Sequence, residues 1–375
     1  MMNPEEFRAL MSEGALTRRQ ITKLLASLGI LTVSIPALHR PASAADVLLQ
    51  VFTWANYDRP EQHKVFTAKY GRSPDFAVLA ENDEARAKVR GGFRPDIAMP
   101  SESHAPFWIK DGLVGPVDVS RLSHWPELFD RMRKIETSMG PNGEHYFVPW
   151  TWGNNSVVFR TDLAPEYVNN PTWTILWDPK FKGRIALRDA YLATTIPAAL
   201  VLGAKDPYNM TDKELAGVAD LLRKQRELVR FYWKAETEAQ QALAAGEIVA
   251  MFAWNSSYAA LKKQGIPVGF MVPKEGMPTW VDGHMLIKGG PAPEQQKYDF
   301  IDATLAPEVG VYNIEQLNYG SSNRKSFQMA DRRVLALLGL EDPDAIMTKG
   351  LWSKAVPPAT YRKMLDLHNR VKSGF

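Results

Sequence analysis

Strand-like and helix-like patterns alternate along the chain after residue 45. Short apolar runs predict strands at 46–54, 76–82 and 95–101, and helical spacing of apolar positions predicts helices at 59–71 and 83–92. The first helix is expected to start after Arg59, with Pro60 in its first turn and Gly71 as its stop. This alternation is typical of an α/β fold with a largely parallel sheet.

Two long extended stretches interrupt the alternation. They are GEHYFVPWTWGNNSVVFRTDL (143–163) and PVGFMVPKEGMPTWVDGHMLI (267–287). Neither stretch contains a helical pattern, and Pro149 limits strand pairing near the middle of the first. We therefore expect both stretches to cross between two lobes of the protein.

The segment between these crossings returns to the alternating pattern. Residues 211–233 predict one amphipathic helix, and residues 236–254 predict a helix, a Gly-Glu turn and a buried strand. The C-terminal third of the chain predicts mostly helices. No internal repeat or low-complexity tract is visible.

The first 44 residues have the pattern of an export signal. Arg18 and Arg19 precede an apolar run over 24–38, and Ala42-Ser43-Ala44 is a small-residue cleavage site. The Thr17–Ile21 run around the two arginines resembles a twin-arginine signal. The run of about 15 residues is shorter than the ~20 that span a bilayer, so cleavage is favoured over an uncleaved anchor. We expect export through a twin-arginine route to the periplasm.

Composition and charge narrow the function. The chain has 45 basic and 42 acidic residues and no cysteine. Near-neutral charge without a basic patch argues against nucleic-acid binding, and the lack of cysteine excludes thiol nucleophiles, thiolate metal sites and disulfides. Common nucleotide-binding, hydrolase and zinc motifs are absent from the sequence, but two-carboxylate hydrolases carry no such signature and stay possible.

Aromatic, hydroxyl and carboxylate side chains gather where predicted strands end, which is where ligands bind in open α/β sheets. They are Trp54, Tyr57, Ser101, Ser103, Asp189, Tyr191, Trp254, Asn255, Ser257, Trp280 and Asp282. Aromatic faces attract an ammonium group by about 0.5–2 kcal/mol each, and a carboxylate adds a charge-assisted hydrogen bond. The pattern predicts a cleft for a cationic amine, although Trp254 could instead be core, Asp189 a helix cap and Asp282 a turn residue.

The order of these residues along the chain resembles that in the substrate-binding proteins of ABC importers for spermidine and putrescine. The resemblance covers most of the chain after the leader. The matching segments are FTWANY, PDIAMPS, KDGLVGPVD, VPWTWGNNSVVF, TWTILWDPKFKGRIALRDA, GEIVAMFAWNSS, VPKEGMPTWVD and NYGSSN, of which LWDPKFKGRIALRD and VPKEGMPTWVD are the most specific.

The resemblance implies a type II periplasmic binding protein, a two-lobe α/β fold with a mainly parallel sheet in each lobe. It implies lobe 1 at 45–148 and 275–317, lobe 2 at 149–274 and 318–375, and a leader at 1–44. The protein would be a monomeric receptor without cofactor, metal or catalysis, which delivers a small organic amine to an ABC permease. The implied ligand-binding residues are Trp54, Tyr57, Ser101, Asp189, Trp254, Trp280 and Asp282, with Ser103, Tyr191, Ser257 and Tyr319 as further candidates.

The chain departs from the polyamine pattern at several positions. Leu192 stands where the family usually has a glutamate, Ser257 where some putrescine binders have an aspartate, and Ser103 where the family has a tyrosine. A late glutamine contact falls near Ser353. This loss of negative charge favours a smaller or less charged amine than spermidine.

Three alternatives stay open at this point. Arg188 is expected on the face of its strand opposite to Asp189, but a bulge that turned it inward would suit a zwitterionic ligand such as an amino acid or opine. Tyr312 and Tyr319 would suit ferric iron, although their spacing of seven is unlike an adjacent pair. An exported carbohydrate enzyme would also use aromatic and carboxylate residues.

Overall fold

The computed structural model describes residues 47–375. The predicted export signal and its cleavage site therefore lie outside the described residues. Within 47–375, no helix has both the length and the apolar character needed to cross a membrane.

The strands form one hydrogen-bonded path, β2-β1-β3-β10-β5-β8-β6-β7, with β4, β9, β11 and β12 attached to β5 or β10. Their bounds are β1 Gln50–Trp54, β2 Asp75–Leu79, β3 Ile97–Ala98, β4 Val114–Gly115, β5 Val148–Arg160, β6 Ile185–Arg188, β7 Val229–Trp233, β8 Ala250–Trp254, β9 Val268–Phe270, β10 Pro278–Ile287, β11 Gly320–Ser321 and β12 Leu351–Trp352. Strand β1 runs parallel to β2 and β3, and β6 runs parallel to β7 and β8.

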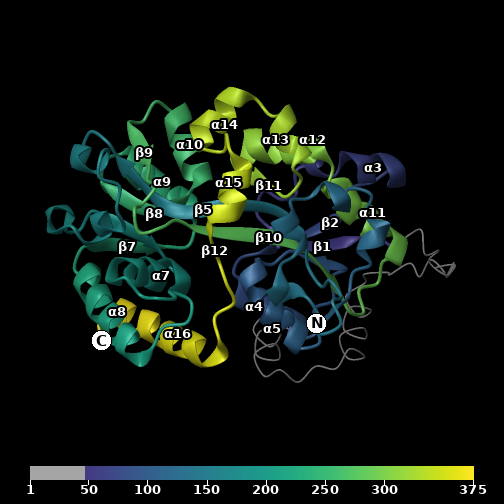
Figure 1. Cartoon of the computed structure of the whole chain (residues 1–375), viewed down its shortest axis with the longest axis horizontal. Helices are drawn as coiled ribbons and strands as arrows, with labels where there is room; N and C mark the ends of the chain where they lie inside the picture. The colour runs from purple at the N-terminus through teal and green to yellow at the C-terminus, as the bar shows by residue number, and fades with distance from the viewer. Residues whose placement is uncertain (1–46) are drawn as a thin grey trace, which may run out of the picture. The chain divides into compact units, whose positions relative to one another are not determined.

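The two predicted crossings are the long antiparallel strands β5 and β10, which run side by side between the two parallel groups (Figure 1). Strand β10 pairs with β3 at one end, and β5 pairs with β8 at the other. The expected α/β architecture, with parallel groups joined by crossing strands, is confirmed.

Helices flank both strand groups, and the C-terminal third is mostly helical as predicted (Figure 1). Their bounds are α3 Lys64–Tyr70, α4 Asn82–Arg90, α5 Ala105–Lys110, α6 Asp130–Arg133, α7 Tyr191–Leu202, α8 Asp212–Arg226, α9 Glu236–Ala244, α10 Asn255–Lys263, α11 Glu294–Thr304, α12 Pro307–Tyr312, α13 Lys325–Met329, α14 Arg332–Leu338, α15 Pro343–Lys349 and α16 Pro358–Ser373. The helix expected after Arg59 begins with a short 3₁₀ turn at Pro60–Gln62 and ends at Gly71 in the left-handed conformation.

One predicted helix is too long. The amphipathic helix expected over 211–233 ends at Arg226, and Val229–Trp233 forms strand β7 beside β6. The sequence Val-Arg-Phe-Tyr-Trp is β-branched and aromatic, which favours a pleated, half-buried surface over a helix. Helix α8 itself starts with the capping box formed by Thr211 and Glu214.

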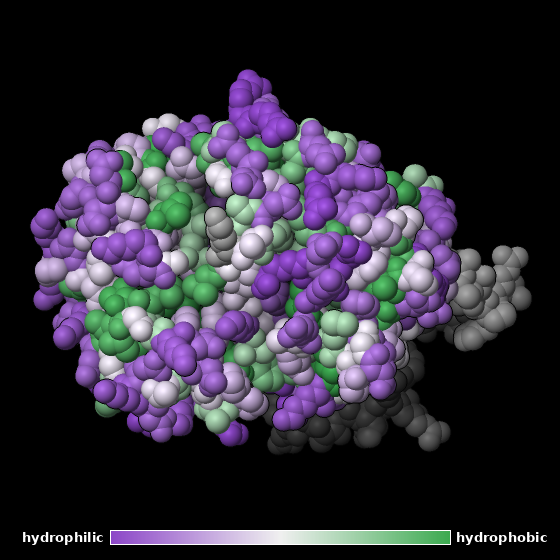
Figure 2. All heavy atoms as spheres, viewed as in Figure 1, coloured by the Kyte–Doolittle hydropathy of each residue, from purple (hydrophilic) through white to green (hydrophobic). Residues whose placement is uncertain are grey.

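The apolar core divides along the crossing strands. Val157 and Phe159 of β5 pack with β6 and β8, whereas Trp152 of the same strand packs in a cluster that contains Phe52 of β1. Most of the surface in Figure 2 is hydrophilic, with apolar residues in scattered patches. The residue boundaries of the two lobes stay a prediction.

Candidate functional site

A cavity of about 1480 Å³ lies where β1, β6 and β8 end, beside the middle of β10. Most of the residues predicted from the sequence line it. These are Trp54, Tyr57, Ser101, Ser103, Trp254, Trp280, Asp282 and Tyr319. Aromatic side chains and a carboxylate therefore meet in one cleft, as expected for a site that binds an organic cation.

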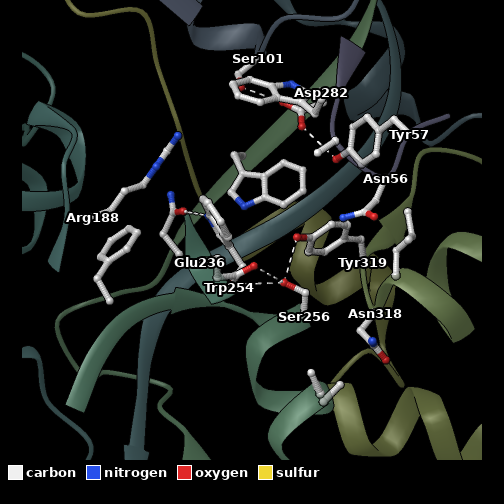
Figure 3. Close-up of a pocket in the computed structure, with 18 of the residues that line it drawn as sticks. Asn56, Tyr57, Ser101, Arg188, Glu236, Trp254, Ser256, Asp282, Asn318 and Tyr319 are labelled. Carbon is white, nitrogen blue, oxygen red and sulfur yellow. Dashed lines mark hydrogen bonds between the residues drawn. The ribbon is translucent and has the colours of Figure 1, made fainter. Parts of the chain in front are cut away.

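Asp282 is the carboxylate at one end of this cleft (Figure 3). It lies two residues after Trp280 on β10, so both side chains point to the same face of the strand. Its Oδ1 accepts a hydrogen bond from Ser101 Oγ at 2.7 Å, and its Oδ2 accepts one from Tyr57 OH at 3.0 Å. Burial raises the pKa of Asp282 to about 7, although these hydrogen bonds act in the opposite direction. A cationic group placed beside Asp282 would favour its ionised form.

The turn after β1 positions the first aromatic wall. Tyr57 N donates to Trp54 O at 3.2 Å, and Asn56 between them has a φ of 72°. Asparagine tolerates this left-handed conformation better than most residues. The Tyr57 ring then packs edge-on against Trp150, with ring centroids 4.8 Å apart. The turn thus brings Tyr57 OH to Asp282.

Trp280 and Trp254 form the second aromatic wall. Trp280 pairs with Gly153 across β5, where an added Cβ would lie 2.5 Å from the Trp280 ring. The ring therefore lies flat over a position that needs glycine, and it meets Tyr319 edge-on at 4.9 Å. Trp254 is held by a 2.8 Å hydrogen bond from its Nε1 to Asn155 Oδ1.

Arg188 and Asp189 occupy the opposite faces from those expected. Arg188 lines the cleft, where its guanidinium pairs with Glu81 and lies 5.0 Å from the centre of the Trp254 ring (Figure 3). Asp189 does not line the cavity; its Oδ1 accepts a 2.7 Å hydrogen bond from Lys372 on α16. The two side chains point in opposite directions, as expected for adjacent residues of an extended chain, but Arg188 and not Asp189 faces the cleft.

The surroundings of Asp189 explain its placement as a structural residue. His368 Nε2 lies 3.3 Å from its Oδ1, and Lys234 Nζ lies 4.0 Å from its Oδ2. Burial tends to raise the pKa of Asp189, but the hydrogen bond and charge of Lys372 outweigh burial and lower it. The carboxylate therefore has cationic partners within the protein and ties β6 to α16.

The comparison with known proteins follows from this architecture. The sequence pattern of a family described as bacterial extracellular solute-binding protein matches residues 65–333. The chain belongs to this family. Since the match covers most of the described residues, the resemblance inferred from the sequence is confirmed.

Relatives and solved structures agree with this assignment. The solute-binding protein is 24% identical over 373 residues to the putrescine/agmatine-binding protein of Pseudomonas aeruginosa, which covers 93% of this chain and 98% of the relative. It is 26% identical over 347 residues to the spermidine/putrescine-binding periplasmic protein of Salmonella typhimurium, covering 90% and 94%. A putative spermidine/putrescine ABC transporter from Listeria monocytogenes superposes with a TM-score of 0.75 at 19% identity, covering 87% and 98%. The two-lobe type II fold is thereby confirmed.

Two further predicted residues of the solute-binding protein lie behind the cleft. Tyr191 is buried, with its ring edge-on to Tyr361 at 5.2 Å. Ser257 is also buried, and its Oγ donates to the carboxylate of Glu236. Neither residue lines the cavity, so Ser257 can act on a ligand only through Glu236.

The sequence prediction missed Glu236, which lines the cleft of the solute-binding protein, and Glu81, the ion-pair partner of Arg188. Glu81 immediately precedes α4 and lies within the strand predicted at 76–82. Glu236 begins α9 and follows β7, which the sequence analysis predicted as part of a helix. An acidic residue in a first helical turn is common, however, because it complements the helix dipole. That ordinary explanation hid both glutamates.

No group of three or more histidine, aspartate or glutamate side chains within 47–375 is arranged to hold a metal ion. Tyr312 and Tyr319 both line the cleft, but Tyr319 OH donates to Ser256 Oγ at 3.0 Å. Burial raises the pKa of both tyrosines, which opposes the phenolate form that iron binding needs.

Proposed function

We propose that this protein is the periplasmic receptor of an ABC importer for an organic amine. It would be exported through a twin-arginine signal, bind its ligand in the cleft as a monomer and deliver it to a permease in the inner membrane. The proposal assigns it no catalysis, no cofactor and no nucleic-acid partner.

The observation that carries this proposal is the environment of Asp282. Its carboxylate is 5% exposed, is held by two hydroxyl groups and lies in a cleft with aromatic walls. Buried carboxylates need a compensating charge, and a ligand ammonium group would supply it. The names of the relatives, which bind putrescine, agmatine or spermidine, support the same ligand class.

A zwitterionic amine is the second candidate, and Arg188 is the observation that favours it. Its guanidinium faces the cleft, where it could bind a carboxylate if Glu81 released it. Ferric iron and a carbohydrate substrate gain no comparable support from the side chains that line the cavity.

Calorimetry or thermal-shift measurements with the purified protein test the proposal. Putrescine, spermidine, γ-aminobutyrate, choline and opines cover the cationic and zwitterionic classes. A ligand at 100 times its dissociation constant adds ~2.7 kcal/mol to the free energy of unfolding. Stabilisation by an amine, without turnover of it, is the expected result; no stabilisation by any of these compounds would refute the amine assignment.

A further inference from the structure

Glu236 is a second carboxylate in the cleft, and its hydrogen bonds have a defined direction. Gln240 Nε2 donates to Ser257 Oγ at 3.0 Å, and Ser257 Oγ is bonded to Glu236 Oε1. Since an amide NH₂ group can only donate, the Ser257 hydroxyl must direct its own hydrogen to Glu236. The network therefore ends on Glu236 as an acceptor.

A tyrosine reaches the same carboxylate through a second serine. Tyr319 OH donates to Ser256 Oγ at 3.0 Å, and Ser256 Oγ donates to Glu236 at 3.3 and 3.4 Å (Figure 3). Two hydroxyl groups thus point their hydrogens at Glu236. These hydrogen bonds favour the charged carboxylate, but burial outweighs them and raises the pKa of Glu236 to about 6.

Asp282 is held by the same kind of network at the other carboxylate. Asn82 Nδ2 donates to Ser101 Oγ at 3.3 Å, and Ser101 Oγ donates to Asp282. Tyr57 completes the set by donating directly to Asp282. An amide and a tyrosine therefore belong to the network of each acid, which includes one serine at Asp282 and two serines at Glu236.

Neither carboxylate has a cationic partner among the residues that the structure describes. The ion pairs found in 47–375 include none to Asp282 or Glu236, and the nearby guanidinium of Arg188 is paired with Glu81 instead. The side-chain hydrogen bonds to each acid come from hydroxyl groups, and a backbone hydrogen bond from Trp254 also reaches Glu236. None of these donors is a cation, although the charge of Arg188 acts on both acids and, against the larger effect of burial, lowers the pKa of each.

We propose that Glu236 binds a second cationic group of the ligand, opposite the group that Asp282 binds. This inference rests on the proposed function and narrows it to a molecule with two positively charged ends, whose apolar middle would contact Trp254 and Trp280. It also corrects the expectation that the cleft has lost charge, because Glu236 supplies the carboxylate that Leu192 and Ser257 do not.

Calorimetry with Glu236→Gln tests the assignment, and Glu238→Gln is the matched control. Both glutamates lie in the first turn of α9, but Glu238 is exposed and does not line the cleft. The probes are diamines of increasing chain length, including putrescine, and the monoamine of each length, such as n-butylamine. Glu236→Gln should weaken the best diamine by at least about 30-fold and leave its monoamine within about threefold.

The possible results separate this inference from the proposed function. In one outcome, the wild type binds a diamine, but Glu236→Gln weakens diamine binding no more than it weakens binding of the matching monoamine. This result would overturn the role of Glu236 and leave the proposed amine receptor intact. In another outcome, the wild type binds γ-aminobutyrate more tightly than any diamine, and Arg188→Gln loses this binding. This result would overturn the role of Glu236 in favour of a zwitterionic ligand. Binding of no amine at all would refute both.

Discussion

Replacing Asp282 by asparagine separates ligand binding from folding in this cleft. The change keeps the shape of the side chain and removes its charge. Truncating one partner of a buried, hydrogen-bonded charge pair costs about 2–5 kcal/mol, which corresponds to roughly 30- to 5000-fold in the dissociation constant. We therefore expect Asp282→Asn to lose at least about 30-fold in affinity for an amine.

The same change should stabilise the ligand-free protein at alkaline pH. Burial raises the pKa of Asp282 from 3.8 to about 7, so ionising this carboxylate in the folded state costs roughly 4 kcal/mol more than in the unfolded chain. Asparagine avoids this cost but loses about 1–3 kcal/mol, because its amide can accept only one of the two hydroxyl hydrogen bonds. The expected net gain is about 1–3 kcal/mol in the free energy of unfolding at pH 8.

The pH dependence of stability gives the sign. Because the folded-state pKa of Asp282 is raised, its contribution to stability is fully present below pH 3.8 and is lost as the pH rises towards about 7. Denaturant unfolding of wild type and variant at pH 5 and pH 8 measures this difference. The gain from Asp282→Asn should be present at pH 8 and disappear at pH 5.

Asp189→Asn is the matched control for this experiment. Asp189 has cationic partners in the protein and lies outside the cleft, so its variant should keep the ligand affinity and lose stability. Unchanged affinity in a folded Asp282→Asn variant, or equal losses of affinity in both variants, would refute the reasoning.

Three further predictions follow from the cleft. Burial raises the pKa of Asp282 to about 7 and that of Glu236 to about 6, so affinity for a diamine should fall by about tenfold per pH unit below about pH 7 and by a further tenfold per unit below about pH 6; calorimetry across pH 5–8 measures it. Gly153→Ala should displace the Trp280 ring and cost about 1–3 kcal/mol of stability and 0.5–2 kcal/mol of amine affinity, whereas Gly115→Ala, with open space around it, should leave affinity unchanged. Arg188→Gln should remove a positive charge from the cleft and strengthen diamine binding in a titration; weaker diamine binding would contradict the cationic assignment.

Most of the fold could be predicted because periodic patterns report on packing. The crossing strands β5 and β10 were recognisable as long extended stretches, and the cleft residues Trp54 and Trp254 as aromatic positions at strand ends. Asp282 lines the cleft as predicted, but it lies within β10 and not at the end of a strand. The ends of helices were less predictable. The error at β7 shows why: the amphipathic pattern continued past Arg226 and concealed the β-branched and aromatic residues of 229–233, which pair with β6 as a strand.

The phase of β6 could not be predicted from its own sequence. Arg188 and Asp189 alternate on either assignment, and a carboxylate at a strand end suits an amine site. The deciding residue is Lys372, 183 positions away on α16, which pairs with Asp189 and fixes the face on which it lies. Deciding which of Arg188 and Asp189 faces the cleft therefore requires a tertiary contact, which the local sequence pattern does not contain.

Glu236 illustrates a different difficulty, in which a carboxylate of the cleft comes from another position in the sequence. The aspartate expected in some relatives at Ser257 would carry the charge itself, whereas here Ser257 is buried and donates to the carboxylate of Glu236, 21 residues earlier in the chain. A residue-by-residue comparison counts such a change as the loss of a ligand contact. The electrostatics of the cleft depend on where the carboxylate lies, not on which position supplies it, so motif positions alone do not reveal the carboxylate of Glu236 that lines this site.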